Sequence, residues 1–336
     1  MIRKPHSVVI ARKAVTAAIV IALIPATAIS SAKSAAAQPA APASIPWPHP
    51  PHLTPVAVFG SDDRQSIPQR LADLRQKIGT LTLDDSTICT AFCVAPDLIA
   101  TASHCLFGTA GSEKSSLTKF AFKVGAAAHS QSSRIAGASN AGAHENVRSG
   151  TENLSLAPPI DAANDWAVAR LAQPICRAGG LTLSDQSRDG MIEAAAAGKL
   201  FQAAMHRDLS STRIFFGGPC AIKTELPDAN AAMIARDFAH PASIILHDCD
   251  TGPGSSGSPM LIEGQNGPEV IGINVGTYVL SRVLNKTADN ESSVHSEPIA
   301  NTAVETARFK SAIDELAAPA HFSVLQRLKP VNLPAQ

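Results

Sequence analysis

The chain has 336 residues, 45% of them hydrophobic, so it can bury the core of one large or two small globular units. Its formal net charge is zero and only 4% of its residues are aromatic. This composition argues against a nucleic-acid partner, because it favours neither a basic surface nor a platform on which bases could stack.

The first 37 residues have the order of a secretory signal. A basic start is followed by an apolar run over residues 14–29 and by the small residues Ser34, Ala35, Ala36 and Ala37. The apolar run is short for a membrane span and contains Pro25. We therefore expect a signal peptide over 1–37, a secreted or periplasmic protein, and no stable membrane insertion after its removal. An anchor that is never cleaved is the alternative.

Proline is frequent from residue 38 to 55, which is typical of an extended segment that does not pack. We assign residues 38–75 to a Pro-rich leader and N-terminal extension, with a short helix over 68–77. The only clear helical periodicity further on covers residues 301–316, and residues 126–158 read as a long variable loop.

Short apolar or alternating segments separated by turn residues fill most of the remaining chain, which is typical of strands. They cover residues 78–83, 88–94, 97–101, 120–124, 166–171, 200–205, 211–216, 242–247, 260–262 and 270–280. Many short strands, few helices and no internal repeat predict an all-β protein, a sandwich or a barrel.

Three motifs carry candidate chemistry, in the order histidine, aspartate, serine. His104 follows an apolar strand, Asp165 precedes another, and Ser256 lies in a loop between Gly254 and Gly257. A serine hydroxyl needs a base to take its proton, and histidine can supply one near neutral pH. A carboxylate on the other ring nitrogen fixes the tautomer and stabilises the imidazolium.

Residues 89–105, 165–171 and 254–259 together resemble the chymotrypsin-fold serine endopeptidases, specifically the bacterial trypsin-like and glutamyl-endopeptidase-like (V8-like) branch. Residues 60–64 resemble the start of the mature enzyme in that branch. The resemblance covers about residues 56–318. It implies two antiparallel six-stranded β-barrels with a short C-terminal helix, and a peptidase that acts on protein or peptide substrates.

The resemblance also implies the domain limits and the roles of residues. The protease domain is expected over 76–320, with an N-terminal barrel over about 76–175, a C-terminal barrel over about 176–300, a helix over about 301–316 and a tail over 321–336. His104 is the general base, Asp165 its orienting carboxylate and Ser256 the nucleophile. The N–H groups of Gly254 and Ser256 form the oxyanion hole. The alternative function is a catalytically silent binding protein on the same fold.

Six cysteines in an exported chain are expected to form bridges. The family has a bridge at the positions of Cys89 and Cys105. We pair Cys220 with Cys249, which precede and enter the nucleophile loop. For Cys93 and Cys176, a third bridge and two buried thiols are both open.

The resemblance places Asp250 at the base of the pocket for the residue before the scissile bond, where a carboxylate selects arginine or lysine. A loop aspartate bonded to solvent or backbone is the other interpretation. Thr251, Asn274, Val275 and Gly276 are expected to line the same pocket, with the last three pairing with the substrate backbone. Asn274 stands where glutamate-specific relatives have a histidine, and Ser255 stands where relatives activated by a new N-terminal amine have an aspartate.

No cofactor is expected, and we expect no metal site, because the histidines lack ligand spacing; His240 and His247, for example, have no third ligand nearby.

Overall fold

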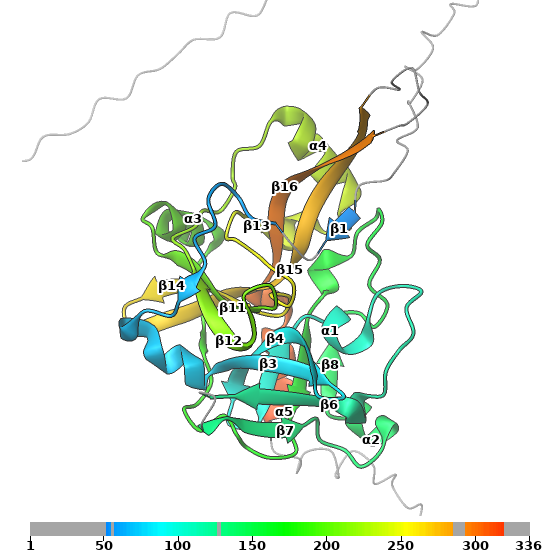
Figure 1. Ribbon diagram of the computed structural model, residues 1–336, viewed down its shortest axis with the longest axis vertical. Helices are drawn as coiled ribbons and strands as arrows, with labels where there is room; N and C mark the ends of the chain where they lie inside the picture. Colours follow the sequence, from blue (N-terminus) through cyan, green and yellow to red (C-terminus); the bar gives the residue numbers. More distant parts are fainter. Residues whose placement is uncertain (1–51, 55–56, 126–128, 285–292, 319–336) are drawn as a thin grey trace, which may run out of the picture. The chain divides into compact units, whose positions relative to one another are not determined.

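The computed structural model describes residues 52–54, 57–125, 129–284 and 293–318, and side chains at 52–54, 280–284 and 293–296 are not described (Figure 1). The expected signal peptide, most of the Pro-rich leader and the C-terminal tail lie outside these residues. Within them, no helix is long and apolar enough to cross a membrane. All the described residues belong to a single compact unit.

The first sheet is antiparallel, has seven strands and carries the order β7-β6-β3-β4-β5-β9-β8. Its strands are β3 (Ile78–Leu83), β4 (Ser86–Ala95), β5 (Leu98–Thr101), β6 (Phe120–Val124), β7 (Gln131–Arg134), β8 (Val147–Ser149) and β9 (Ala167–Arg170). Ile135, just after β7, bridges to Leu171, just after β9, so the sheet curls round until distant strands meet. The enclosed core includes Leu81, Phe92 and Phe122, all fully buried.

The second sheet has nine strands, seven of them in the order β13-β16-β15-β14-β11-β12-β2. They are β1 (His52–Thr54), β2 (Gln65–Ser66), β10 (Thr182–Leu183), β11 (Leu200–His206), β12 (Ser210–Gly217), β13 (Ile244–His247), β14 (Pro259–Gly264), β15 (Gly267–Leu284) and β16 (Ser293–Glu305). Both β1 and β10 pair with β15, and the pairing of β10 is parallel.

The helices are short. They are η1 (Gln69–Gln76), α1 (His104–Phe107), η2 (Leu117–Lys119), α2 (Asn140–His144), η4 (Ala162–Asn164), α3 (Arg188–Ala196), α4 (Asp228–Asp237), η5 (Pro241–Ser243), η6 (Thr306–Arg308) and α5 (Lys310–Ala317).

The all-β double-barrel prediction is confirmed, but the sheets are larger than six strands each. In the second sheet, six strands of four residues or more are joined by three very short ones: β2 at the edge beside β12, and β1 and β10 beside β15. Of these, β1 and β2 come from the N-terminal extension, and no pattern in its residues predicts strands there.

Three expectations about local structure were wrong. The C-terminal helix begins at Lys310 rather than 301, because residues up to Glu305 belong to β16 and pair with both β13 and β15. Pairing with a strand on each side satisfies the backbone hydrogen-bonding groups of these residues. The stabilisation from this pairing outweighs the helical spacing of their apolar side chains. Residues 126–158 contain β7, α2 and β8, and α3 and α4 were not expected.

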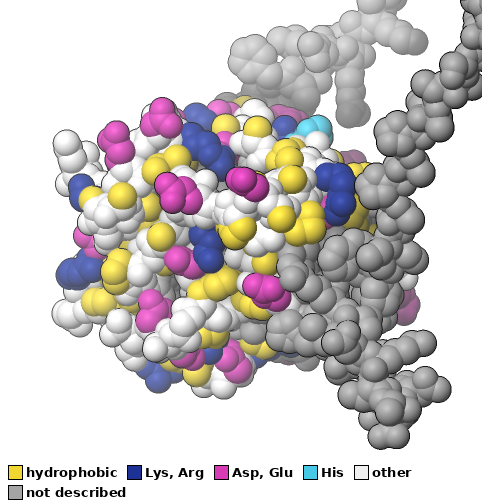
Figure 2. All heavy atoms as spheres, turned by 90° about the horizontal axis from the view of Figure 1, so that it is seen from above, with side chains coloured by type: hydrophobic (Ala, Val, Ile, Leu, Met, Phe, Trp, Pro, Cys, Tyr) yellow, Lys and Arg dark blue, Asp and Glu magenta, His cyan; other side chains and the backbone are white. Residues whose placement is uncertain are grey.

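The two sheets meet where β3 and β4 contact β11 and β12. The face seen in Figure 2 mixes acidic, basic and hydrophobic side chains without a continuous region of one sign. The candidate catalytic residues lie instead near the contact between the sheets, as described next.

Candidate active site

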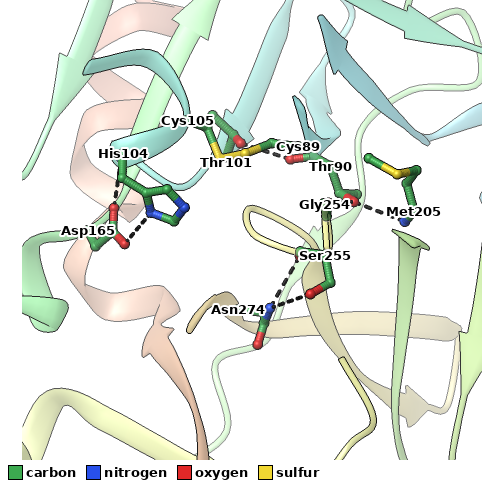
Figure 3. Close-up of a disulfide and its surroundings, with 10 residues drawn as sticks. All are labelled: Cys89, Thr90, Thr101, His104, Cys105, Asp165, Met205, Gly254, Ser255 and Asn274. Carbon is green, nitrogen blue, oxygen red and sulfur yellow. Dashed lines mark hydrogen bonds and ion pairs between the residues drawn. A yellow bond between two sulfur atoms is a disulfide. The ribbon is translucent and has the colours of Figure 1, made fainter. Parts of the chain in front are cut away.

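His104 and Asp165 come from two separate connections of the first sheet. His104 opens α1 directly after β5, and Asp165 follows η4 just before β9. His104 Nδ1 lies 2.7 Å from Asp165 Oδ2, and the His104 backbone N–H donates to Asp165 Oδ1 over 2.9 Å. Because both carboxylate oxygens are used, the aspartate is fixed in its plane and orients the imidazole. Figure 3 shows this pair.

The surroundings of His104 favour its protonated form more than water favours that of a free histidine side chain. Burial lowers the pKa of His104, but the negative charge of Asp165 and its hydrogen bond raise it by more, so the pKa lies above its ordinary value. Asp165 is fully buried. A carboxylate placed in this way stabilises the imidazolium that forms when the histidine accepts a proton.

All six cysteines are paired. The bridges are Cys89–Cys105, Cys93–Cys176 and Cys220–Cys249. Two of them are the expected pairs, and the third settles the open alternative at Cys93 and Cys176 in favour of a bridge. The first bridge ties α1, and so His104, to β4. Although the sulfur atoms and a His104 nitrogen lie within 4.8 Å of one another, disulfide sulfurs are not thiolates and cannot bind a metal as such.

Ser256 lies in the connection from β13 to β14, which two glycines shape. Gly254 has φ of +96°, and a Cβ there would lie 2.3 Å from the Met205 Cε. Gly257 has φ of +81°, and a Cβ there would lie 2.2 Å from Thr101 Oγ1. Both positions therefore require glycine, for conformation and for space.

Four successive carbonyl groups of this loop accept hydrogen bonds from neighbouring elements. Arg207 N donates to Pro253 O (2.7 Å), Thr90 Oγ1 to Gly254 O (2.9 Å), Ser258 N and Asn274 Nδ2 to Ser255 O (3.1 and 3.2 Å), and Thr90 N to Ser256 O (2.9 Å). In a trans peptide the N–H points away from the C=O. The N–H groups of Gly254 and Ser256 are therefore turned to the other side of the loop, and the described residues include no acceptor for either.

Thr90 brings this loop next to the histidine. It follows Cys89, which is bridged to Cys105, the residue after His104. Figure 3 shows Thr90 between the disulfide and Gly254. The described contacts include no hydrogen bond within 3.5 Å between the Ser256 hydroxyl and His104, and such contacts in free enzymes often shorten only when substrate binds.

Residues 89–273, more than half of the chain, match the family described as "Trypsin-like peptidase domain". The chain belongs to this family. A solved structure described as "Structure of Glu endopeptidase in complex with MPD" is similar over 78% of this chain and 100% of that chain, with 16% sequence identity and a TM-score of 0.49. A search among curated proteins finds no match.

In this trypsin-like peptidase, Asp250 does not have the position expected of an open pocket carboxylate. Its Oδ1 accepts the Phe59 N–H over 2.8 Å, its Oδ2 accepts the Asp63 N–H over 3.0 Å, and the residue is 2% exposed. The structure thus favours the alternative of a backbone-bonded aspartate. Burial and the charge of Asp250 raise the pKa of Asp63 to about 6.

The other four residues expected in the pocket are also buried. Thr251 exchanges backbone and side-chain hydrogen bonds with Ala57, at 2.8 and 2.9 Å. Asn274 Nδ2 donates to Ser255, and Gly276 O accepts from Thr302 Oγ1 over 2.9 Å. Val275 is 4% exposed. The side chains of Thr251 and Asn274 thus bind other parts of the trypsin-like peptidase, and the place of these four residues in a substrate pocket stays a prediction.

Sequence reasoning missed the role of the N-terminal segment in this trypsin-like peptidase. Arg64 is 4% exposed and bridges Asp62 (2.7 Å) and Asp208 (2.8 Å). A Cβ at Gly252 would lie within 3.0 Å of Arg64, Asp208 and the buried His206, so the loop before the nucleophile packs directly on this cluster. Burial lowers the pKa of His206 to about 4. The similarity of residues 60–64 to a mature N-terminus was a signal, but it did not indicate these contacts.

Proposed function

We propose that this trypsin-like peptidase is an exported serine endopeptidase that uses Ser256, His104 and Asp165 through an acyl-enzyme. The observation that carries the proposal is the combination of two features. His104 is oriented by both oxygens of a buried Asp165, and the adjacent loop presents Ser256 with two backbone N–H groups for which the described residues offer no acceptor.

The mechanism follows from these positions. The Ser256 Oγ attacks the scissile carbonyl carbon while His104 Nε2 accepts the hydroxyl proton. The negative charge that develops on the carbonyl oxygen is stabilised by the N–H groups of Gly254 and Ser256, typically by about 3–4 kcal/mol per donor. His104 then gives its proton to the leaving amine, and a water molecule, deprotonated by the same histidine, hydrolyses the acyl-enzyme.

The second sheet supports a peptide substrate that binds as an added strand. On the side of β15 away from β16, β14 pairs up to Ile273 and β1 pairs from Thr277. Between them, the Asn274 carbonyl accepts the Gly257 N–H, and the Asn274 N–H donates to the Ser258 carbonyl. Among the described residues no strand covers Val275 on this side, so its backbone groups are the proposed partners of an extended substrate, whereas the Gly276 carbonyl is already bonded to Thr302.

We make no proposal that the enzyme prefers arginine or lysine, because the Asp250 carboxylate has no free oxygen facing a substrate. Export is supported by the three disulfides, which persist in oxidising compartments, and by the signal-like order of residues 1–37. The reaction as proposed uses only groups of the chain and water.

The test is labelling by a fluorophosphonate probe together with casein hydrolysis. Wild-type protein should be labelled and active, Ser256→Ala should lose both, and the neighbouring Ser255→Ala should keep the label. Labelling of Ser256→Ala would contradict the assignment of the nucleophile. Wild-type protein that is folded but neither labelled nor active would favour the silent binding protein instead.

A further inference from the structure

Asn274 connects β15 to the nucleophile loop through four hydrogen bonds. Its Nδ2 donates to Ser255 O over 3.2 Å and to Ser255 Oγ over 3.4 Å. Its backbone O accepts the Gly257 N–H over 2.8 Å, and its own N–H donates to Ser258 O over 2.9 Å. Asn274 is 1% exposed, so these contacts form away from solvent (Figure 3).

The side-chain contact acts on one particular peptide unit. The Ser255 carbonyl and the Ser256 N–H belong to the same planar trans peptide, so the two groups point in opposite directions. A donor that holds the carbonyl therefore also sets the direction of the N–H. The amide must present Nδ2 here, because the reverse orientation would place Oδ1 against two oxygens of Ser255.

We propose that Asn274 is a positioning residue that holds the Ser256 N–H in the orientation needed to bind the oxyanion. This inference rests on the proposed serine-peptidase function and assigns Asn274 a role different from lining the substrate pocket. The contact is uncharged and lies within the folded barrel, so it keeps the oxyanion hole formed without an ion pair to the residue before the nucleophile.

The size of the effect follows from what an oxyanion donor contributes. Removing one donor outright lowers kcat by about 10²–10³. Asn274 only orients the donor, and the Ser258 N–H holds the same carbonyl over 3.1 Å. We therefore expect a loss in kcat of about 10- to 100-fold when the Asn274 side-chain donor is removed.

The experiment compares ester hydrolysis by the full chain and its variants. The substrate is p-nitrophenyl acetate, whose acetyl group is too small to depend on a specificity pocket. Asn274→Asp has the same shape but no Nδ2 donor, and it should lower kcat by about 10- to 100-fold with KM changed by less than about threefold.

Ser255→Ala is the matched control, because it removes the hydroxyl that Asn274 contacts and keeps the carbonyl. Its kcat should stay within about threefold of wild type. If Asn274→Asp fails to fold, as judged by thermal unfolding, Asn274→Ser replaces it and should show the same loss in kcat.

Two results would overturn the inference while leaving the proposed function intact. In the first, wild-type protein and the Asn274 variants hydrolyse the ester equally well, and only KM values for peptides change; Asn274 is then a pocket residue. In the second, Ser255→Ala loses as much activity as Asn274→Asp, so the hydroxyl and not the carbonyl carries the contact. Absence of ester hydrolysis and of labelling in wild type would instead overturn the proposed function.

Discussion

The two halves of the proposed site are held in place in different ways. In the first sheet, His104 and Asp165 meet side chain to side chain, and a disulfide beside them ties α1 to β4. In the second sheet, the part of the chain that the structure describes contains no such partner for the Ser256 side chain, and the loop is fixed through its backbone carbonyls by Thr90, Arg207 and Asn274. The first half depends on the identity of two residues, and the second on the register of several strands.

This difference teaches where substitutions should act. In the histidine half, a single side-chain substitution can abolish a catalytic role while leaving the geometry of the site almost unchanged. In the serine half, the Ser256 hydroxyl can be removed directly, but the two oxyanion donors are backbone groups that cannot be substituted, so they are tested through the neighbours that orient them. The following three predictions are ordered by the expected effect on activity.

The largest effect is expected for Asp165→Asn in the histidine half. An amide at this position keeps the shape, but it favours the wrong tautomer of His104 and should lower kcat by about 10⁴-fold. The charge of Asp165 helps to raise the pKa of His104, and the base works only when neutral. The acid limb of the kcat/KM profile should therefore lie above the ordinary histidine value in wild type and move to lower pH in the variant.

The matched control is Asp161→Asn, next to η4. Asp161 bonds to Asn164 rather than to His104, so its loss should leave both kcat and the acid limb within about twofold of wild type. An acid limb that does not move in Asp165→Asn would show that His104 is not the titrating base.

An intermediate effect is expected for Thr90→Val, which tests the serine half. The Thr90 hydroxyl donates to Gly254 O over 2.9 Å and accepts the Met205 N–H over 3.0 Å, and the residue is fully buried. Its loss leaves two buried backbone groups unpaired, at about 1–3 kcal/mol each. We expect lower thermal stability and about a tenfold loss in kcat, measured on p-nitrophenyl acetate.

Thr82→Val is the control for this prediction. Thr82 is also buried and donates to Ala121 O over 3.2 Å, and this contact does not involve the nucleophile loop. It should lose stability and keep kcat within about twofold. Equal losses of kcat in the two variants would mean that the loop responds to general destabilisation and not to the contact with Gly254.

The smallest effect on catalysis is expected for Asp250→Asn. One N–H of the new amide would face a backbone N–H, so stability should fall by about 1–3 kcal/mol. Part of this loss should be offset, because the charge of Asp250 is one cause, after burial, of the raised pKa of Asp63. Cleavage of a mixed peptide library should show the same preferences as wild type, with Asp248→Asn as a control for the change in charge.

A selective loss of cleavage after arginine and lysine in Asp250→Asn would contradict this assignment. Such a result would return Asp250 to the base of the substrate pocket and would mean that the N-terminal segment leaves it when substrate binds.

Much of the histidine half could be predicted from the sequence. The motifs around His104 and Asp165 each join one polar residue to an apolar strand, and the order of the three motifs limited the fold to a family in which they meet. Strand positions were also predictable where apolar residues were continuous, as in β5 and β11. These signals are local sequence patterns, so they can be recognised without knowledge of the rest of the structure.

The contacts that hold the serine loop could not be predicted in this way. Thr90 lies far from Ser256 in the sequence, and nothing in its neighbours shows which carbonyl its hydroxyl will meet. Asn274 was assigned to the pocket wall by position, but its side-chain direction depends on the bulge in β15 between Asn274 and Gly276. The burial of Asp250 depends on Phe59 and Asp63 in the N-terminal extension, where no local pattern indicates a contact with the loop before the nucleophile.

That segment also defines the smallest form of the protein that should be prepared for study. A shortened chain that began at residue 76, the expected start of the protease domain, would lack the Ala57, Phe59 and Asp63 backbone groups. Asp250 would then lose both of its backbone donors, and each hydrogen bond to a charged group contributes about 1.5–3 kcal/mol. Expression boundaries should therefore lie upstream of residue 52, so that the folding unit includes the stretch its own nucleophile loop is built against.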